Sequence, residues 1–354
     1  MNVPQLSARQ ALRASTVTWQ SEPASGSLSL DATSLAIAPT CSCTGESSAN
    51  STCSCGGGGT GGCTCGSPAV APFIYMIGTI KPAFPSLSVE KEFLQAIEPP
   101  IPPVDPLTIP SPQSDAWYFQ VLSKTANLYI AREMCWQFRM DAVSPYLVIP
   151  RSQNELLGII SASAPTPINV VDFDVVIGRM GPAAPPEMCN GLVVPTIVCD
   201  ESFDFTNQQY IAAIIEKLKQ GSGGVNPINP PVPNPDPKLV AFVFSTVLRM
   251  ADNTGDTNNF RATNFLAVRY LQVYVLAYNM LTNNFSPKLA DPAGYFLNSV
   301  SVKPAPVQGN QVIVDVVFAF LGQSTNTLIR WFCRVNVSGE FPFLVLPLTP
   351  YYGT

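Results

Sequence analysis

The sequence predicts an α+β protein, with helices and strands mixed through its first half, an antiparallel sheet in its C-terminal third, and a flexible Cys/Gly/Ser-rich tail in front. Two hydrophobic periods carry this prediction. Between residues 207 and 281, apolar residues recur at helical spacing. In the C-terminal third, Trp331, Cys333, Val335 and Val337 instead alternate with polar residues, which is typical of strands that bury one face.

The composition fits a folded core beneath a surface with few charges. Of 354 residues, 46% are apolar and 12% are charged, against about 25% charged residues in an average globular protein. Such a surface favours association, so we expect a homo-oligomer. The net charge of −5 argues against nucleic acid as a partner, because a phosphate backbone is bound by clustered Lys and Arg. The absence of histidine removes the general base used by most hydrolytic sites.

Neither a secretion signal nor a membrane span is predicted. Residues 1–20 include Arg9 and Arg13 but lack the apolar run of about 7 to 15 residues that a signal needs. Later apolar runs are interrupted by charge or proline before about 18 residues. We therefore expect a cytoplasmic protein, in a compartment where thiols usually stay reduced. An extracellular or cell-surface location is expected only if the protein is instead a subunit of a fibre or sheath, an alternative described below.

Residues 1–71 are rich in Ser, Thr, Ala and Gly and have few large apolar side chains, so we expect a low-complexity tail without a core. This tail contains pairs of cysteines that are separated by one residue. Two thiols at this spacing can chelate a soft ion such as Cu(I) or Zn(II), although zinc sites more often have longer spacers. Alternatively, an enzyme modifies or cross-links these side chains, or the tail is inert. Six of the ten cysteines form three such pairs, Cys41 and Cys43, Cys53 and Cys55, and Cys63 and Cys65.

The first half of the body is predicted as short helices and strands in mixed order. Residues 73–80 are β-prone and bounded by Gly and Pro, and Ser88 resembles the N-cap of a helix that ends before Pro99. Further helices are predicted at 115–134 and 155–161, and further strands at 135–140, 145–150, 169–177 and 192–199.

The second half begins with helices and ends with strands. Apolar spacing predicts helices at 207–219 and 260–281. Between them lies an apolar stripe formed by Leu239, Phe242, Val243, Val247 and Met250. An antiparallel meander is predicted from strands at 312–320, 330–338 and 343–348.

Two segments rich in Pro interrupt the predicted helices and strands of residues 72–354, one at 99–112 and the other at 221–237. The first is predicted as an extended connector between helices. The second is predicted as a hinge, and we treat residues 72–354 as one domain in which 221–237 separates two lobes.

Two groups outside the tail could support chemistry. Cys189 is the best-placed nucleophile among the isolated cysteines, but without histidine it needs a nearby cation or helix N-terminus to lower its pKa. Asp172 and Asp174 lie two residues apart on a predicted strand, as a pair of acid/base carboxylates could. The simpler interpretations are a buried, inert thiol and a solvated strand face or salt bridge.

Five stretches, in order, resemble one family. The resemblance covers about residues 72–352 and is to the C-terminal domain of unknown function of PatG-type cyanobactin maturation proteins. The stretches are PSLSVEKEFLQA from Pro85, AREMCW from Ala131, DVVIGRMGPAAPPEMCNGLVVP from Asp174, MADNTGDTNNFRATNFLAVRY from Met250 and EFPFLVLPLTPYY from Glu340.

The resemblance implies an accessory role beside peptide-modifying enzymes. PatG-type proteins cleave and cyclise peptides with a subtilisin-like domain, which this sequence lacks, and without histidine it cannot assemble the Ser/His/Asp triad. No catalytic residue is transferred. We expect a non-catalytic accessory or binding protein whose partner is a peptide or a modifying enzyme, and whose tail is a modification substrate or a soft-metal ligand. The alternative is a self-assembling fibre or sheath subunit cross-linked through its cysteines.

Overall fold

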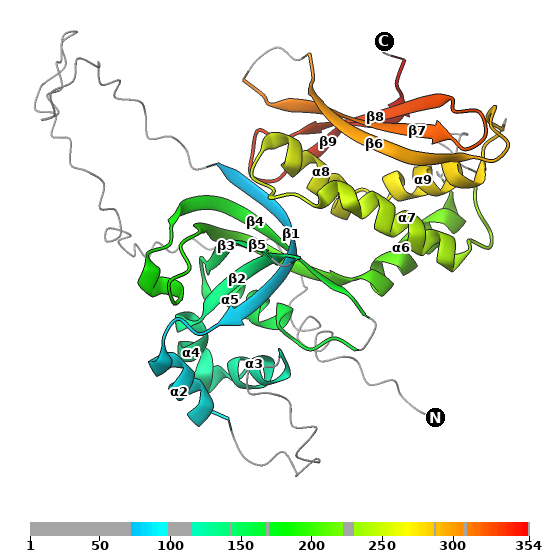
Figure 1. The fold of residues 1–354 in the computed structure, drawn as a ribbon. Coiled ribbons are helices and arrows are strands. Elements are labelled where there is room, and N and C mark those ends of the chain that lie inside the picture. Colours follow the sequence, from blue (N-terminus) through cyan, green and yellow to red (C-terminus); the bar gives the residue numbers. More distant parts are fainter. Residues whose placement is uncertain are drawn as a thin grey trace, which may run out of the picture. The chain divides into compact units, whose positions relative to one another are not determined.

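The structure is a computed structural model. It describes residues 72–97, 115–141, 143–167, 170–221, 230–286, 288–306 and 310–352, which all belong to one compact unit of the chain. The predicted α+β class is confirmed, with a closed barrel in the first part and a four-stranded antiparallel sheet at the C-terminal end (Figure 1). Within the described part of the chain, no helix has the length and apolar content needed to cross a bilayer.

The barrel consists of five strands in the order β1-β2-β3-β5-β4. All neighbours pair antiparallel except β3 and β5, which are parallel. β-branched and aromatic residues dominate these segments, as expected for strands that bury a face. The strands are β1 (Phe73–Ala83), β2 (Cys135–Met140), β3 (Val143–Pro150), β4 (Asp172–Ala183) and β5 (Pro195–Thr206).

One helix, α5 (Gln153–Ala162), connects β3 to β4 and packs against β1, β3 and β5. It begins where the Ser152 hydroxyl accepts a hydrogen bond from the Asn154 backbone amide, and it buries Leu156 and Ile159 in the barrel core. This strand order, with its parallel β3/β5 pair and its helix between β3 and β4, is the arrangement of an OB-fold barrel.

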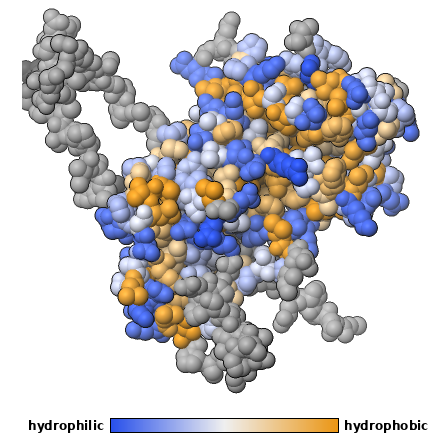
Figure 2. Space-filling model, in the orientation of Figure 1, coloured by the Kyte–Doolittle hydropathy of each residue, from blue (hydrophilic) through white to orange (hydrophobic). Residues whose placement is uncertain are grey.

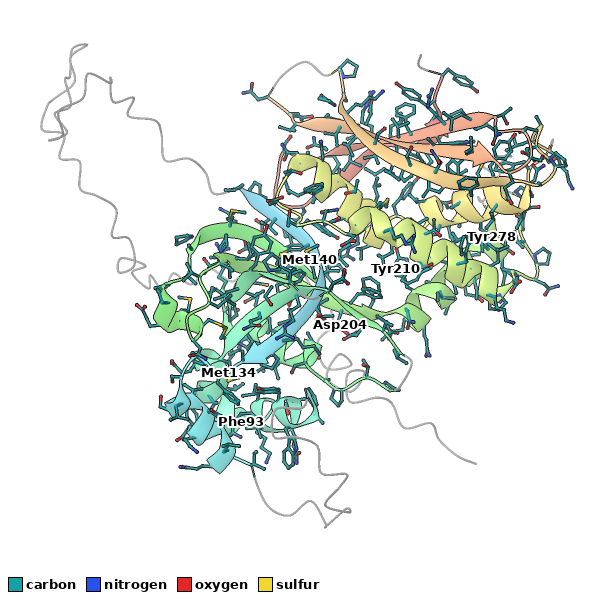
Figure 3. The ribbon with its side chains drawn as sticks, in the orientation of Figure 1. Phe93, Met134, Met140, Asp204, Tyr210 and Tyr278 are labelled. Carbon is teal, nitrogen blue, oxygen red and sulfur yellow. A yellow bond between two sulfur atoms is a disulfide. The ribbon has the colours of Figure 1, made fainter. Side chains whose placement is uncertain are left out.

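A helical insertion separates β1 from β2. Phe93, labelled in Figure 3, packs there with Phe84 and Tyr118, and the ring centroids are 5.2 to 5.5 Å apart. The first helix begins at Ser86, whose hydroxyl accepts from the Val89 amide, and not at the predicted Ser88. The insertion contains α2 (Leu87–Gln95), α3 (Asp115–Leu122) and α4 (Leu128–Glu133).

The single helix predicted at 115–134 is wrong, because the chain leaves the helical conformation between α3 and α4. Lys124 is extended, with φ −74° and ψ 130°. The Asn127 side chain donates to the Val121 carbonyl at 3.0 Å, satisfying a group left open at the end of α3.

Of the four helices that follow the barrel, the last two pack directly on one face of the C-terminal sheet (Figure 1). The predicted helix 260–281 breaks at Tyr270, whose backbone, with φ −121° and ψ 79°, is not helical. On α7, Val240 and Phe244 are buried whereas the predicted stripe residue Phe242 is 54% exposed. The helices are α6 (Asn207–Gln220), α7 (Pro237–Leu248), α8 (Asn258–Arg269) and α9 (Gln272–Thr282).

The C-terminal sheet is an antiparallel meander in the order β6-β7-β8-β9, which confirms the predicted alternation: Trp331, Cys333, Val335 and Val337 are all buried. The prediction omitted β6, whose exposed face carries mostly small and polar residues. The strands are β6 (Tyr295–Pro304), β7 (Ile313–Gly322), β8 (Leu328–Asn336) and β9 (Phe343–Pro350).

A buried polar cluster joins the barrel to the helices. The Asn264 side chain of α8 is fully buried and donates to the Tyr75 carbonyl of β1 at 2.7 Å, and its amide also bonds to Asn253. The Tyr75 amide donates to the Gly255 carbonyl at 3.1 Å. Gly255 has φ +67°, and a Cβ there would lie 2.2 Å from the Tyr75 carbonyl oxygen, so this close approach requires glycine.

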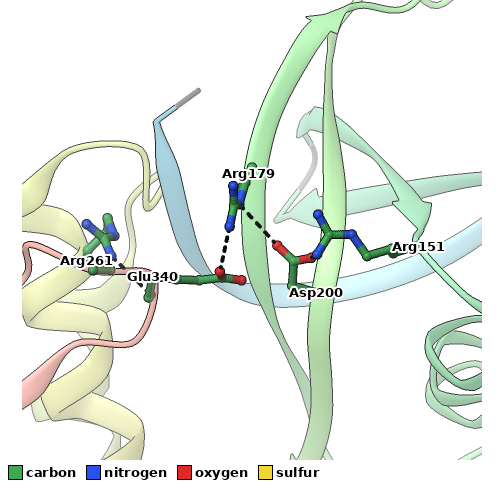
Figure 4. A network of polar contacts seen from close by, with 6 residues as sticks. Arg151, Arg179, Asp200, Arg261 and Glu340 are labelled. Carbon is green, nitrogen blue, oxygen red and sulfur yellow. Dashed lines mark hydrogen bonds and ion pairs between the residues drawn. The ribbon is translucent and has the colours of Figure 1, made fainter. Parts of the chain in front are cut away.

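An arginine–carboxylate network makes a second connection (Figure 4). Arg179 of β4 lies between Asp200 of β5, at 3.7 Å, and Glu340 of the β8–β9 turn, at 3.4 Å. Arg151 pairs with Asp200. The buried Arg261 donates to the carbonyls of Val337, Gly339 and Glu340, which fixes that turn. Burial lowers the pKa of Arg261 to about 10, so the side chain stays charged at neutral pH.

Candidate functional site

A hollow of about 660 Å³ lies between the barrel and helices α6 and α7. This is within the size range of small-molecule and peptide-side-chain sites. Its walls come from β1, β2, β4, α6 and α7 and from the turn after α7. We call it the helix-side hollow, and the residues that matter most for its chemistry are Ile77, Arg139, Asp172, Phe173, Ile211, Phe244, Leu248, Arg249 and Asp252.

Aromatic rings form the floor of the helix-side hollow. Phe173 of β4 packs edge-on against Phe244 of α7, with centroids 6.1 Å apart, and stacks on Phe205 at 5.3 Å. Behind them, Tyr210 of α6 contacts Phe205 and Phe244 and donates through its hydroxyl to the Ala267 carbonyl at 2.9 Å (Figure 3). The floor is therefore held by the main core and is pre-formed for an apolar group.

The barrel wall of the hollow depends on a close approach of β1 and β2. A Cβ on Gly78 would lie 2.4 Å from the Arg139 carbonyl oxygen and 2.8 Å from the Phe138 ring. The register between β2 and β3 shifts between Phe138 and Met140, which is a bulge next to Arg139. Bulges redirect side chains, and here Arg139 belongs to the rim of the hollow.

The rim carries both signs of charge. Arg139 and Arg249 are among its lining residues, and so are the three aspartates Asp141, Asp172 and Asp252. The Ser245 hydroxyl also lines the hollow but donates to the Phe242 carbonyl of its own helix at 2.9 Å. An apolar floor with a rim of donors and acceptors suits a peptide that inserts an apolar side chain and hydrogen-bonds through its backbone.

The structure separates the two aspartates that the sequence suggested as a pair. Asp174 is 2% exposed, and its carboxylate accepts a hydrogen bond from the Ile80 amide of β1 at 2.6 Å. Asp172 lines the helix-side hollow. Asp174 is thus engaged in strand packing, while Asp172 lies at the candidate site. Sequence spacing showed that the two residues are close but not how deeply each is buried.

The interpretation of Cys189 as a nucleophile is wrong, because Cys189 forms a disulfide with Cys135. Their Cα atoms are 5.4 Å apart although 54 positions separate them in sequence. The pairing depends on the turn after β4 folding back onto the first residue of β2, which no local sequence signal reveals.

The other two isolated cysteines of the body, Cys199 and Cys333, are free and buried, as predicted. Burial, then the nearby Glu155, raises the pKa of the Cys199 thiol to about 12. Burial also raises the pKa of Cys333. Neither thiol is therefore activated at neutral pH.

The six cysteines at positions 41 to 65, predicted as metal ligands or modification sites, lie outside the described residues. The described ranges contain no group of three or more His, Cys, Asp and Glu residues placed to hold a metal ion. The metal prediction for Cys41, Cys43, Cys53, Cys55, Cys63 and Cys65 therefore stays a prediction.

When the sequence is compared with known protein families, two family models match it, and their ranges overlap. The family model described as PatG Domain matches residues 73–282, and the model described as PatG C-terminal matches residues 236–351. A solved structure, "PatG Domain of Unknown Function", aligns with a TM-score of 0.57 and 14% identity, covering 79% of this chain and 99% of that one. That likeness shows a shared fold. No curated protein matches the sequence.

Proposed function

This chain belongs to the PatG domain family, and from that premise we propose that it is a non-catalytic accessory protein that binds peptides during ribosomal-peptide modification. The observation that carries the proposal is the helix-side hollow, with its aromatic floor and its rim of mixed charge. Among its described lining residues, the Ser245 hydroxyl is engaged by its own helix, and the chain has no histidine to serve as a base. Such a site favours binding over turnover.

The Cys-rich segment extends this proposal. In it, residues 41–65 are either presented to a modifying enzyme or ligate a soft ion such as Cu(I) or Zn(II). Intact-mass measurement of the protein from its native host tests both versions, because cyclisation, disulfides and bound metal each change the mass. An unmodified, metal-free segment would exclude both.

Binding at the helix-side hollow is tested with blocked tetrapeptides that carry apolar or charged side chains, by calorimetry on the full chain. Ser245→Trp places a large ring in the hollow from an exposed position of α7, and Lys238→Trp adds the same ring elsewhere on that helix. We expect apolar tetrapeptides to bind the wild type and Lys238→Trp alike, and Ser245→Trp at least about tenfold more weakly. Equal binding to all three proteins would exclude the hollow as the site.

A second function is favoured by the exposed apolar residues of the C-terminal sheet. Phe296 on the edge strand β6, and Phe343 and Val345 on the edge strand β9, are 39 to 55% exposed. Figure 2 shows apolar residues gathered over this part of the molecule. Open edges and apolar patches promote self-association. A fibre or sheath subunit, cross-linked through Cys41–Cys65, would bury them.

Light scattering with and without reductant separates the two functions. The accessory protein is expected to give the same small species under both conditions. Large assemblies that reductant dissolves would favour the structural subunit instead.

A further inference from the structure

A second cleft lies on the outer face of the barrel. No residue of α6 or α7 is among its described lining, and Arg139 is the one described residue that lines both this cleft and the helix-side hollow. The cleft consists of two adjoining hollows of about 640 and 540 Å³ that share Ala83, Phe84 and Asn190 in their linings. It crosses β1, β2 and β3, between the start of α2 and residues 184–194, which connect β4 to β5. We call it the barrel-face cleft.

One wall of the cleft is a turn with little freedom to move. The disulfide ties Cys189 in this turn to Cys135, the first residue of β2. Asn190 has φ +47° and Gly191 φ +87°, and the Gly191 amide donates to the Pro186 carbonyl at 2.7 Å. The Leu192 amide donates to the Cys189 carbonyl at 2.9 Å. The wall is therefore pre-organised, which lowers the entropic cost of binding.

The floor of the cleft is polar and ordered. Gln137 projects outward from β2, and its amide donates to the Cys189 sulfur at 3.6 Å. Its carbonyl oxygen accepts from Arg139 at 3.3 Å and from Ser144 at 3.5 Å. The exposed Leu87 lines one of the two hollows, and the exposed Val143 lines the other. Amide, hydroxyl and guanidinium groups between apolar side chains match an extended peptide, which presents polar backbone and side chains together.

The charge of the cleft selects among peptides. Lys81 and Arg139 supply two cations, and Glu90 is the one carboxylate among the described lining residues. The local balance is thus positive on a chain whose net charge is −5. We propose that the barrel-face cleft binds an extended peptide segment that carries Asp or Glu side chains, at a site that shares only Arg139 with the helix-side hollow.

The position of the cleft agrees with the fold. OB-fold barrels bind chain-like ligands on the face of strands 2 and 3, between the loops that follow β1 and β4, and the barrel-face cleft occupies that place. The fold supplies the location only, and the ligand class rests on the lining residues. Two cations are few for nucleic acid, whose binding requires many phosphate contacts.

Fluorescence anisotropy on the full chain tests the proposal. The probe is a labelled ten-residue peptide of alternating Glu and Val, and its twin has Gln in place of Glu. We expect the Glu peptide to bind and the Gln twin to bind about tenfold more weakly. Lys81→Glu should weaken the Glu peptide by a similar factor, whereas Lys288→Glu, an equal charge change on an exposed residue outside the cleft, should not.

Two further variants complete the binding experiment. Ser144→Glu introduces a carboxylate from β3 and replaces Lys81→Glu should that variant fail to fold. Ser245→Trp, which fills the helix-side hollow, should leave Glu-peptide binding unchanged, so the two sites can fail independently. Equal affinity for the Glu and Gln peptides, equal losses in Lys81→Glu and Lys288→Glu, or preferential binding of a ten-nucleotide thymidine oligomer would overturn the proposal.

Discussion

Single buried polar residues hold together parts of this protein that are far apart in sequence. Asn264 is fully buried, and its side chain contacts the backbone of a strand 189 positions earlier. Arg261, one turn before it on α8, secures the turn between β8 and β9. Such residues are expensive to bury unless every polar group finds a partner, and then they specify one arrangement.

Replacing Asn264 tests this role. Asn264→Ala leaves the Tyr75 carbonyl without its side-chain donor and removes both bonds to Asn253. We expect the free energy of unfolding to fall by about 3 kcal/mol in urea denaturation. The control is Asn259→Ala on the exposed side of the same helix, expected to change stability by less than about 0.5 kcal/mol. Similar effects of both changes would contradict the role given to Asn264.

The hydrogen bonds to the Asp291 carboxylate lead us to expect that the stability of the fold decreases at acidic pH. Burial raises the pKa of its carboxyl, but side-chain and backbone hydrogen bonds from Ser324 and Thr325 outweigh burial and hold the pKa well below its usual value. A carboxyl with a lowered folded-state pKa stabilises the fold fully above its unfolded pKa of about 3.9, and this contribution decreases progressively as pH falls from that value toward the lower folded-state pKa.

We therefore expect Asp291→Asn to be less stable than the wild type at pH 7, and the difference to shrink as pH falls below about 4. Thermal unfolding followed from pH 7 down to pH 3 measures it. A difference that is constant over this range would show that the carboxylate charge is not what Asp291 contributes.

Sequence patterns identified residue types at the site better than their roles. The spacing of Asp172 and Asp174 marked the strand that enters the helix-side hollow, yet only Asp172 lines it. Phe173, Phe244 and Arg139 carried no local signal, because their meeting depends on a barrel strand, a distant helix and a bulge. Side-chain periodicity reports one element at a time, whereas a site is made where elements meet.

At the scale of elements, long periodic segments were predicted well and their interruptions were not. Strand β2 matches its predicted range, and α6 differs from it by one residue. The helices predicted at 115–134 and 260–281 each break in two, because the backbone of Lys124 is extended and that of Tyr270, with φ −121° and ψ 79°, is not helical. Apolar spacing continues across such breaks, so periodicity alone does not reveal them. The barrel closure was also not predicted, since it requires pairing of β1 with β4 about 100 residues later.

A substitution of Gly78 tests whether the barrel wall of the helix-side hollow depends on the close approach of β1 and β2. Gly78→Ala puts a methyl group against the Arg139 carbonyl, so we expect a loss of about 1 to 3 kcal/mol in unfolding free energy and weaker tetrapeptide binding. Gly339→Ala is the matched control, because no atom beyond the two adjacent residues lies within 4 Å of the added Cβ. An unchanged Gly78→Ala protein would mean that β1 and β2 have room to separate there.

The disulfide makes a further prediction for the turn between β4 and β5. A link across 54 positions is worth roughly 4 kcal/mol in the chain-entropy account. Reductant should therefore lower the urea midpoint of the wild type, and a Cys135→Ser/Cys189→Ser variant should have the lower midpoint with or without reductant. Counting free thiols under denaturing conditions verifies the disulfide. An equal urea midpoint for the wild type with and without reductant would contradict a stabilising role for it.

At the scale of the whole molecule, an OB-type barrel and a helix-backed sheet form one described unit with two clefts that share only Arg139, one with an apolar floor and one with a polar floor. Both clefts suit peptides, and neither presents an activated nucleophile among its described residues. This arrangement supports an accessory protein that holds a peptide while chemistry occurs elsewhere. The Cys-rich segment at 41–65 would then be the part of the chain that is itself modified or metallated.

The central claim is that the helix-side hollow binds a peptide without changing it. The most direct measurement is an NMR titration of the isotope-labelled full chain with an apolar blocked tetrapeptide, followed by mass spectrometry of the recovered peptide. We predict shifts concentrated on the methyl groups of Ile77, Ile211 and Leu248, and a peptide of unchanged mass. Shifts elsewhere in the protein with these methyls unmoved, or a cleaved or cyclised peptide, would contradict the account.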